Sequence, residues 1–356
     1  MMKSLHRWYE KIGEVLPFTL LTIGTVVIPL FFLPYTRDSL NLSKELFLFV
    51  VTSLALLFWF LRVALTKQVR IRHTILDIPL VLFIVFVSIS FLFSRSPAAS
   101  FFGVTHQFVL HLLAIIPVVL WAWLLIQEVR TPRRLYLCVT AFLLSGIGTL
   151  IIFLFGNTVF LQDIFQFDVI GFNTVSTLNS VFGVYITCVA LVSLGVVLKK
   201  GNSLWEYIIP IIAFFLSIWG MVSLGFAVVW VLFALGLALT ILFGWFAVER
   251  VHTWILSGVL LLCIISMLLA IFGTPVKVKS VLPVEVTLSF ATSWEITQQS
   301  LLVGVKSFLV GSGPGMFVYD FSAFRPALFN TNELVSDIRF YVPFNTFFAL
   351  TTEFGL

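Results

Sequence analysis

The side chains best suited to chemistry in this chain lie in its one long polar stretch, residues 274–342. Arg325 and Arg339 carry planar guanidinium groups, which hold a diphosphate through paired hydrogen bonds. Tyr319 and Tyr341 carry aromatic rings that can stack on the apolar face of a sugar while their hydroxyl groups hold its hydroxyls. The pattern predicts a site for a sugar linked to a diphosphate. The alternative is a belt of aromatic side chains at a membrane surface, with arginines that extend toward the lipid headgroups.

Two carboxyl groups in the same stretch are candidate proton acceptors. Glu333 and Asp337 precede Arg339, and a positioned carboxylate can remove the proton of an attacking hydroxyl group. The stretch contains no Asp-x-Asp pair and no cluster of His and Cys. The sequence therefore predicts neither a metal ion nor another cofactor.

The rest of the chain has the composition of a membrane protein. Of its 356 residues, 60% are hydrophobic and 10% are charged, against about 45–50% and about 25% in soluble domains, and the mean hydropathy is +1.12. A membrane-spanning helix needs roughly 20 apolar residues. The sequence thus predicts an all-α, polytopic transmembrane bundle. Its candidate spans are residues 16–34, 46–65, 78–93, 108–127, 135–155, 178–198, 207–223, 226–247 and 254–273.

The distribution of Lys and Arg orients these spans. If the N-terminus is cytoplasmic, the inner segments contain thirteen of these residues and the short outer loops contain only Arg37, Lys44 and Arg95. Cytoplasmic loops are enriched in Lys and Arg, so we expect a multi-pass protein of the cytoplasmic (inner) membrane with its N-terminus inside. The net charge of +5 is then a sign of topology and not of nucleic-acid binding.

Three parts follow from this topology. Residues 1–273 are predicted to form a nine-span bundle, residues 274–342 an extracytoplasmic loop, and residues 343–356 the start of a tenth span that the chain leaves incomplete. Loops of such length without a role are uncommon. We therefore expect the active face to be the extracytoplasmic one.

The long loop carries signals of local structure. Thr292 and Glu295 have the spacing of a capping box, and apolar residues then recur at helical spacing. This predicts an amphipathic helix of about five turns, on the membrane surface or on the bundle. Gly311 is placed to end the helix and Pro314 to prevent its continuation. The segment GSGPG, residues 311–315, is therefore interpreted first as a helix stop and tight turn, because a nucleotide-phosphate loop would need a preceding strand and a following Lys-Ser/Thr pair.

The interiors of the predicted spans contain almost no ionisable side chains. Transporters usually place such groups at mid-membrane, so proton- or ion-coupled transport is disfavoured relative to a function on the outer face. Cys138, Cys188 and Cys263 all fall within spans and lack the spacing of metal ligands. We interpret them as small apolar core residues.

Three short segments resemble a known family. Residues 311–317 read GSGPGMF, which has the family pattern Gly-x-Gly-x-x-x-Phe. Residues 343–355 read PFNTFFALTTEFG and keep the Pro, Asn, Glu and Gly of a helix that opens with Pro-His-Asn in the family. Residues 93–103 read FSRSPAASFFG, similar to an outer loop between the third and fourth spans. With the predicted topology, these segments resemble the O-antigen ligase and polymerase family, membrane glycosyltransferases with about twelve spans and a long periplasmic loop between the ninth and tenth.

The resemblance implies a reaction and its partners. Family members move a glycan from an undecaprenyl-diphosphate carrier, a polyprenyl diphosphate, to a hydroxyl group of a glycan, lipid or protein acceptor outside the cytoplasmic membrane. Arginines hold the diphosphate in the family, and Arg339 is the first candidate here, followed by Arg325 and Arg95. Glu353 is a candidate to orient Asn345. The implied catalytic set is Arg339, Glu333, Asp337 and Asn345, and the implied substrate-binding set is Arg325, Arg95, Tyr319, Tyr341, Gly313, Gly315 and Glu353.

One position departs from the family pattern. Phe344 stands where the family has a histidine implicated in catalysis. Either another residue transfers the proton, or the chain binds a glycan without transferring it, or the role of that histidine is not general. A flippase or other transporter of lipid-linked glycans is the alternative from a different class, and it would need a polar or basic path through the bundle.

Overall fold

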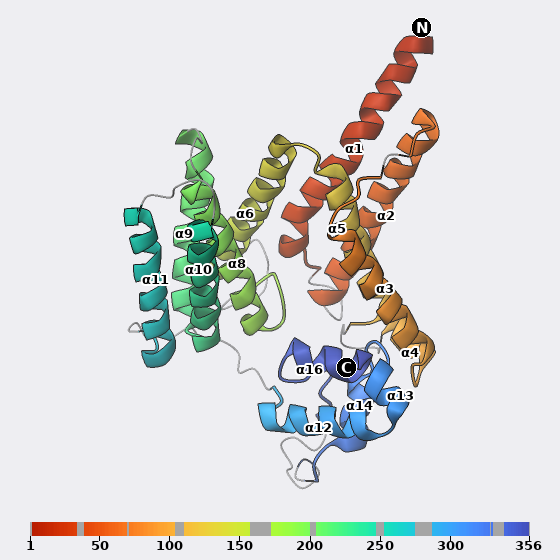
Figure 1. The fold of residues 1–356 in the computed structure, drawn as a ribbon, viewed down its shortest axis with the longest axis vertical. Coiled ribbons are helices and arrows are strands. Elements are labelled where there is room, and N and C mark those ends of the chain that lie inside the picture. The colour runs from red at the N-terminus through yellow and green to blue at the C-terminus, as the bar shows by residue number, and fades with distance from the viewer. Residues whose placement is uncertain are drawn as a thin grey trace. The chain divides into compact units, whose positions relative to one another are not determined.

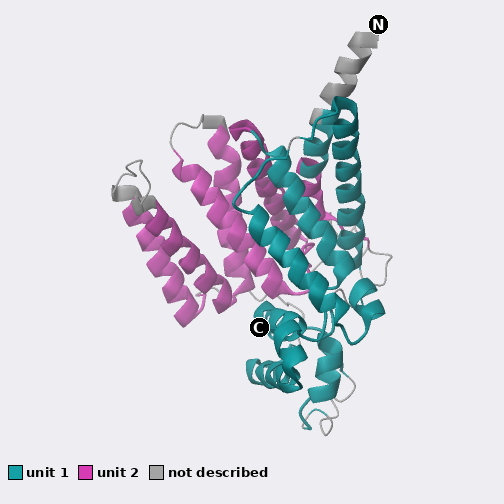
Figure 2. Cartoon of the chain, turned by 45° about the vertical axis from the view of Figure 1, so that its right-hand side comes forward, with its two compact units in different colours: residues 1–21, 34–130, 285–356 teal, residues 22–33, 131–284 magenta. Residues whose placement is uncertain are grey.

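The protein is built of helices. A computed structural model describes residues 2–33, 39–69, 71–103, 110–156, 172–199, 204–246, 253–274, 287–327, 329 and 338–355. These residues form fourteen helices and no strand, in agreement with the predicted all-α class. The chain divides into two compact units (Figure 2): unit 1 comprises residues 1–21, 34–130 and 285–356, and unit 2 comprises residues 22–33 and 131–284.

The helices are labelled in Figure 1, and α1 (Met2–Leu30) contributes to both units. Unit 1 also contains α2 (Asn41–Thr66), α3 (Asp77–Leu92), α4 (Pro97–Phe102), α5 (Leu112–Glu128), α12 (Phe290–Leu302), α13 (Val305–Val310), α14 (Phe317–Phe324) and α16 (Thr346–Phe354). Unit 2 contains α6 (Pro132–Phe155), α8 (Asn179–Leu198), α9 (Leu204–Leu224), α10 (Ala227–Phe246) and α11 (Thr253–Phe272).

Each of the nine apolar segments predicted to span a membrane contains one helix. Four of these helices, α2, α6, α8 and α9, are long and apolar enough to cross a membrane, and α1, α3, α5, α10 and α11 each contain a shorter apolar stretch. Their exposed side chains are apolar too: Phe243 is 70% exposed and Phe272 is 81% exposed. Extended exposed apolar surfaces are unusual in soluble monomers. The helices therefore suggest a multi-pass membrane protein.

Two ion pairs establish the relative direction of α2 and α5 in unit 1. Where the two helices begin, the His111 imidazole Nε2 lies 2.7 Å from Oε1 of Glu45. Where they end, the Arg62 guanidinium Nη2 lies 2.6 Å from Oε1 of Glu128. The two helices are therefore parallel, as expected for the second and fourth of a series of alternating spans.

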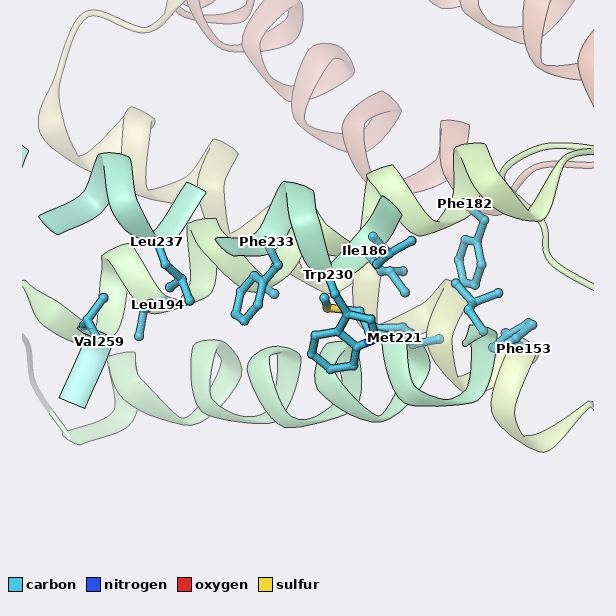
Figure 3. Close-up of a cluster of buried hydrophobic side chains, with 13 residues drawn as sticks. Phe153, Phe182, Ile186, Leu194, Met221, Trp230, Phe233, Leu237 and Val259 are labelled. Carbon is cyan, nitrogen blue, oxygen red and sulfur yellow. The ribbon is translucent and has the colours of Figure 1, made fainter. Parts of the chain in front are cut away.

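The largest apolar cluster of unit 2 among the described residues is shown in Figure 3. Its buried members include Phe182 from α8, Met221 from α9 and Phe233 from α10. Small residues allow the helices to approach closely: a Cβ atom at Gly236 on α10 would overlap the side chain of Leu191 on α8. Small residues at helix contacts are typical of membrane bundles, because packing rather than water exclusion drives association there.

The described cysteines form no disulfide bond. Cys138 and Cys263 are half-buried, whereas Cys188 is exposed on α8. The interpretation of all three as core residues is therefore wrong for Cys188. A small apolar side chain suits the apolar outer surface of such a helix as well as its interior.

The described residues among 287–342 have a hydrophobic core of their own within unit 1. Leu288, Ile296, Phe317, Phe321 and Phe340 are buried against one another, so α12, α14 and the segment before α16 form one body. Figure 1 shows α12, α13, α14 and α16 grouped near α4, with α12 and α16 lying across the direction of α3.

The predicted amphipathic helix begins three residues earlier than the predicted cap. Ser289 is the N-cap of α12, and its hydroxyl oxygen accepts a hydrogen bond from the backbone N–H of Thr292 at 3.1 Å. Glu295 accepts a hydrogen bond from the Gln299 side-chain amide at 3.3 Å. The predicted capping box of Thr292 and Glu295 is therefore wrong, because Ser289 is the N-cap and Thr292 already lies inside the helix.

The same helix is also interrupted. It ends at Leu302 and resumes as α13 after Gly304, whose backbone is extended with φ 174. Glycine has a low helix propensity, so the single helix of about five turns is replaced by two shorter ones. The prediction that Gly311 ends the amphipathic segment is confirmed, since it caps α13 with φ 72.

The final helix, α16, is nine residues long. It ends at Phe354, where Gly355 has φ 85 and donates a hydrogen bond to the carbonyl oxygen of Thr351. This helix by itself is shorter than a membrane span. The tenth span therefore stays a prediction.

Candidate functional site

The GSGPG turn is a left-handed connection between α13 and α14. All three of its glycines have positive φ: 72 at Gly311, 112 at Gly313 and 70 at Gly315. Glycine adopts such backbone angles without the steric penalty that a Cβ atom brings. Any other amino acid at one of these three positions would therefore strain the backbone of the turn.

Two other segments of unit 1 bind this turn through backbone hydrogen bonds. The N–H groups of Ser312 and Gly313 donate to the carbonyl oxygens of Thr352 and Glu353, both at 3.0 Å, at the end of α16. On its other side, the Arg95 N–H donates to the carbonyl oxygen of Ser312 at 3.2 Å. The turn therefore contacts both of the other segments with family-like patterns, although the three lie apart in the sequence.

The contact between the turn and the segment after α3 leaves no room for a side chain at residue 313. A Cβ atom at Gly313 would overlap the Ser94 side chain and lie 3.0 Å from Oγ of Ser100. The Ser94 and Ser100 hydroxyl oxygens are themselves 2.5 Å apart in a hydrogen bond. Movement of Ser94 would therefore break a second interaction.

We expect Gly313→Ala to lower the stability of the protein by about 1–3 kcal/mol, because it combines a positive φ with this overlap. Thermal unfolding of the purified variant measures the effect. Gly304→Ala is the matched control, because no atom lies within 4 Å of a Cβ there and φ is extended; its effect should stay within about 0.5 kcal/mol. Equal effects of the two substitutions would contradict the close packing of the turn.

An ion pair between Arg95 and Asp320 lies beside the turn. The Arg95 guanidinium Nη1 is 3.1 Å from Oδ1 of Asp320, with the arginine side chain 36% exposed and the aspartate 0% exposed. A guanidinium has five N–H donors. The buried Asp320 carboxylate thus holds one nitrogen of the Arg95 guanidinium, while the Arg95 side chain is partly exposed at the surface.

Burial raises the pKa of the Asp320 carboxyl above its ordinary value of 3.8, and the nearby Ser312 and Ser300 hydroxyl groups together with the Arg95 charge oppose that rise. A carboxyl with a raised native pKa binds its proton more tightly in the folded than in the unfolded state. Its contribution to stability is therefore greatest at low pH and decreases as the pH rises through the native pKa.

This linkage predicts the pH dependence of Asp320→Asn. The Asp320→Asn variant lacks the stabilisation that the protonated Asp320 carboxyl gives at low pH. The stability of the variant relative to wild type should therefore increase between about pH 4 and about pH 7. The gain should be roughly 1.4 kcal/mol for each pH unit between the native and unfolded pKa values. Unfolding temperatures of both proteins at the two pH values measure it. A relative loss on raising the pH would mean that the ion pair outweighs the cost of burial.

Glu353 is buried against the same turn. Its Oε1 accepts a hydrogen bond from the Phe317 N–H at 3.4 Å, and its backbone carbonyl accepts one from the Ser90 hydroxyl at 2.7 Å. Its Oε2 is buried and has no hydrogen-bond partner among the described residues. Glu353 therefore joins α16 to α3 and to the start of α14.

The structure adds a pair of residues that the sequence analysis missed. The His111 and Glu45 side chains meet at 2.7 Å, with His111 1% exposed. Two glycines lie close to His111: a Cβ at Gly103 would be 3.1 Å from the imidazole Nδ1, and one at Gly315 would be 3.6 Å from the His111 Cβ. Only the topology pointed to this pair, because both residues lie at predicted outer ends of spans. A histidine held by a carboxylate can accept a proton.

The predicted site residues divide into two groups. Arg95, Gly313, Gly315 and Glu353 gather around the turn. Tyr319 is exposed on α14, Arg325 and Tyr341 are half-buried, and Arg339 is exposed. Among the described residues, neither Arg339 nor Tyr341 forms an ion pair or a hydrogen bond with the Arg95–Asp320 pair. The roles of Arg339, Arg325 and the two tyrosines stay predictions.

Asn345 has a structural task in this fold. It is the N-cap of α16, and its side-chain oxygen accepts a hydrogen bond from the Phe348 N–H at 2.9 Å. The expectation that Glu353 orients Asn345 is wrong. The two lie eight residues apart, or about 12 Å along the helix axis, and Glu353 is directed to the Phe317 N–H instead.

Phe344 packs on α12. Its N–H donates to the Ser293 hydroxyl at 2.9 Å, and its ring lies 5.8 Å from that of Phe290, edge to face. The Phe344 side chain is still 51% exposed. An imidazole at this position would therefore be accessible.

The predicted bases Glu333 and Asp337 lie outside the described residues. No group of three or more His, Cys, Asp or Glu side chains in the described part is placed to hold a metal ion. The described groups offer an exposed guanidinium edge, two buried carboxyl groups and a His–Glu pair. Chemically, such a set can bind an anion and exchange a proton.

Comparison with protein-family models, curated proteins and solved structures found no match to this chain. The function of this chain is therefore inferred from its own residues and from the geometry of unit 1.

Proposed function

We propose that this protein is a membrane glycosyltransferase of the O-antigen ligase or polymerase type. In this proposal it moves a glycan from a polyprenyl-diphosphate carrier to an acceptor hydroxyl group at the outer face of the cytoplasmic membrane. The site lies around the GSGPG turn, and Arg95 is its centre.

One observation supports this proposal above the others. The three segments on which the resemblance rests are the FSRSPAASFFG segment, the turn and α16, and the turn binds both of the others through the backbone of Ser312 and Gly313. A chance likeness of three short patterns would give no reason for these segments to meet. A shared functional site gives that reason.

Arg95 has the properties that a diphosphate site requires. Asp320 holds one of its nitrogens at 3.1 Å and is fully buried, while the arginine side chain is 36% exposed. A guanidinium held on one edge is pre-organised to bind an anion with its remaining donors. Arg95 is thus better supported as the diphosphate ligand than Arg339, which has no described anchor.

The proposed reaction is a substitution at the anomeric carbon. The acceptor oxygen forms a bond to that carbon while the bond to the diphosphate oxygen breaks, and the carrier diphosphate leaves with the electron pair. Arginine stabilises the charge that develops on the leaving group. The hydroxyl proton passes to a base, for which Glu333, Asp337 and the His111–Glu45 pair are the candidates.

The lipid-linked and surface glycans of cells with and without the intact gene test this proposal. Loss of a ligase should cause long carrier-linked chains to accumulate, and loss of a polymerase should cause single repeat units to accumulate. Unchanged glycans would contradict a transferase. Accumulation of donor confined to the cytoplasmic face would favour the flippase alternative.

The proposed outer location of the site has its own test. The bias of Lys and Arg predicts that a cysteine at Ser289 reacts with a membrane-impermeant thiol reagent in intact cells, whereas one at Gln68 does not. Both positions are exposed in the structure, so folding does not mask either. The reverse labelling pattern would move the site to the cytoplasmic face.

A further inference from the structure

An exposed apolar corner lies where α12 meets α13. It is formed by Leu302, Val303, Val305, Phe308 and Leu309, which are 71%, 57%, 77%, 45% and 52% exposed. Gly304 lies at its tip, and no atom is within 4 Å of a Cβ built there. The α12–α13 corner therefore projects from unit 1 with apolar side chains on its outer side.

The back of this corner is firmly packed. A Cβ atom at Gly355 would lie 2.6 Å from the carbonyl carbon of Leu309, so the end of α16 lies directly against α13. The following residue pair, Ser312 and Thr352, is joined by a backbone hydrogen bond of 3.0 Å. The α12–α13 corner is therefore fixed in position by its packing against α16.

The corner continues the apolar surface of α3. Helix α13 packs near the end of α3, where Leu92 is 73% exposed and Phe93 is 52% exposed. Lys306 Nζ lies 5.8 Å from the centre of the Phe93 ring. The two helices thus present one connected apolar surface with the Lys306 ammonium at its edge.

The charge pattern identifies what covers this surface. Residues 301–310 read LLVGVKSFLV, with one lysine and no acidic residue. An apolar face with a lysine that extends to polar surroundings is typical of segments at a lipid headgroup boundary. Helix α3 has exposed apolar side chains along its length, which suits contact with hydrocarbon.

We propose that the α12–α13 corner inserts into the bilayer, at the headgroup boundary of the leaflet in which α3 ends. Leu302, Val305 and Phe308 enter the acyl region, and the Lys306 ammonium stays among the headgroups. The GSGPG turn follows α13 directly, so the corner holds the turn at the membrane surface. This inference does not require the proposed reaction, and it can fail or hold independently of it.

Spin-label accessibility in lipid nanodiscs tests the insertion. A nitroxide is attached at Val305→Cys or at Ser322→Cys in a background with Cys138, Cys188 and Cys263 replaced by alanine. Val305 and Ser322 are both exposed, and Ser322 lies on α14 and is not part of the corner. At residue 305 we expect dissolved oxygen to collide with the label more often than a water-soluble nickel complex does. At residue 322 we expect the opposite order.

Three results would overturn the proposal. A label at 305 that prefers the nickel complex lies in water. A label at 305 that neither reagent reaches is covered by protein. Oxygen preference that emerges only after a polyprenyl lipid is added would assign the surface to that chain and not to the bilayer. If Val305→Cys lowers the unfolding temperature, Leu302→Cys replaces it, because Leu302 is 71% exposed on the same corner.

Discussion

Arg95→Lys is expected to slow glycan transfer by about 10²–10³-fold, the cost of losing one charged donor to a developing anion. Lysine keeps the positive charge but lacks the planar fork, so it cannot hold Asp320 and a diphosphate together as a guanidinium can. The rate is measured with purified protein in lipid vesicles and a synthetic polyprenyl-diphosphate-linked glycan as donor. Lysine is chosen because an alanine would leave Asp320 buried without its 3.1 Å partner.

Two further substitutions show whether this loss is specific. Arg339→Lys tests the residue that the sequence analysis placed first, and we keep the prediction that it also impairs transfer if Arg339 touches the diphosphate. Arg133→Lys, exposed near the start of α6 in unit 2, is the control and should be nearly silent. Equal small effects at all three positions would mean that neither Arg95 nor Arg339 binds the diphosphate. A loss of transfer in Arg339→Lys alone would place the diphosphate site at Arg339 and away from the turn.

The second large effect is expected at the proton acceptor. A positioned base contributes roughly 10²–10⁴-fold to the rate, so either Glu333→Gln or Asp337→Asn should slow transfer by that order while the donor still binds. Phe344→His should then change the rate only modestly, because another residue already accepts the proton. Single-turnover rates together with donor binding separate the two steps.

Other outcomes of this experiment are equally informative. If both amide variants keep full activity, neither carboxyl is the base, and the proton passes to the His111–Glu45 pair, to water or to the departing phosphate. If the wild-type protein transfers nothing and Phe344→His creates transfer, the natural chain binds glycans without reacting them. The exposure of Phe344, 51%, makes that gain of function a fair test, because an imidazole there is accessible.

Local features of the fold could be predicted because their causes are local. Each of the nine apolar segments contains a helix, since a run of apolar residues and its polar ends are read directly from the chain. Gly311 was recognised as a helix end because its neighbours show where the pattern stops. The prediction misplaces the start of α12 by three residues because Ser289 and Thr292 are both good N-cap residues, and the structure has Ser289 in that role.

The amino-acid sequence by itself determined the all-helical class, the apolar helical segments and the turn that begins at Gly311. Only the tertiary structure decided which side chains meet around that turn. Arg95 pairs with Asp320, and Glu45 pairs with His111. Periodicity and composition describe neighbours along the chain, whereas these pairs depend on how α2, α3, α5, α14 and α16 pack. In the sequence, Asp320 is indistinguishable from other acidic loop residues. In the fold it is buried and pairs with Arg95.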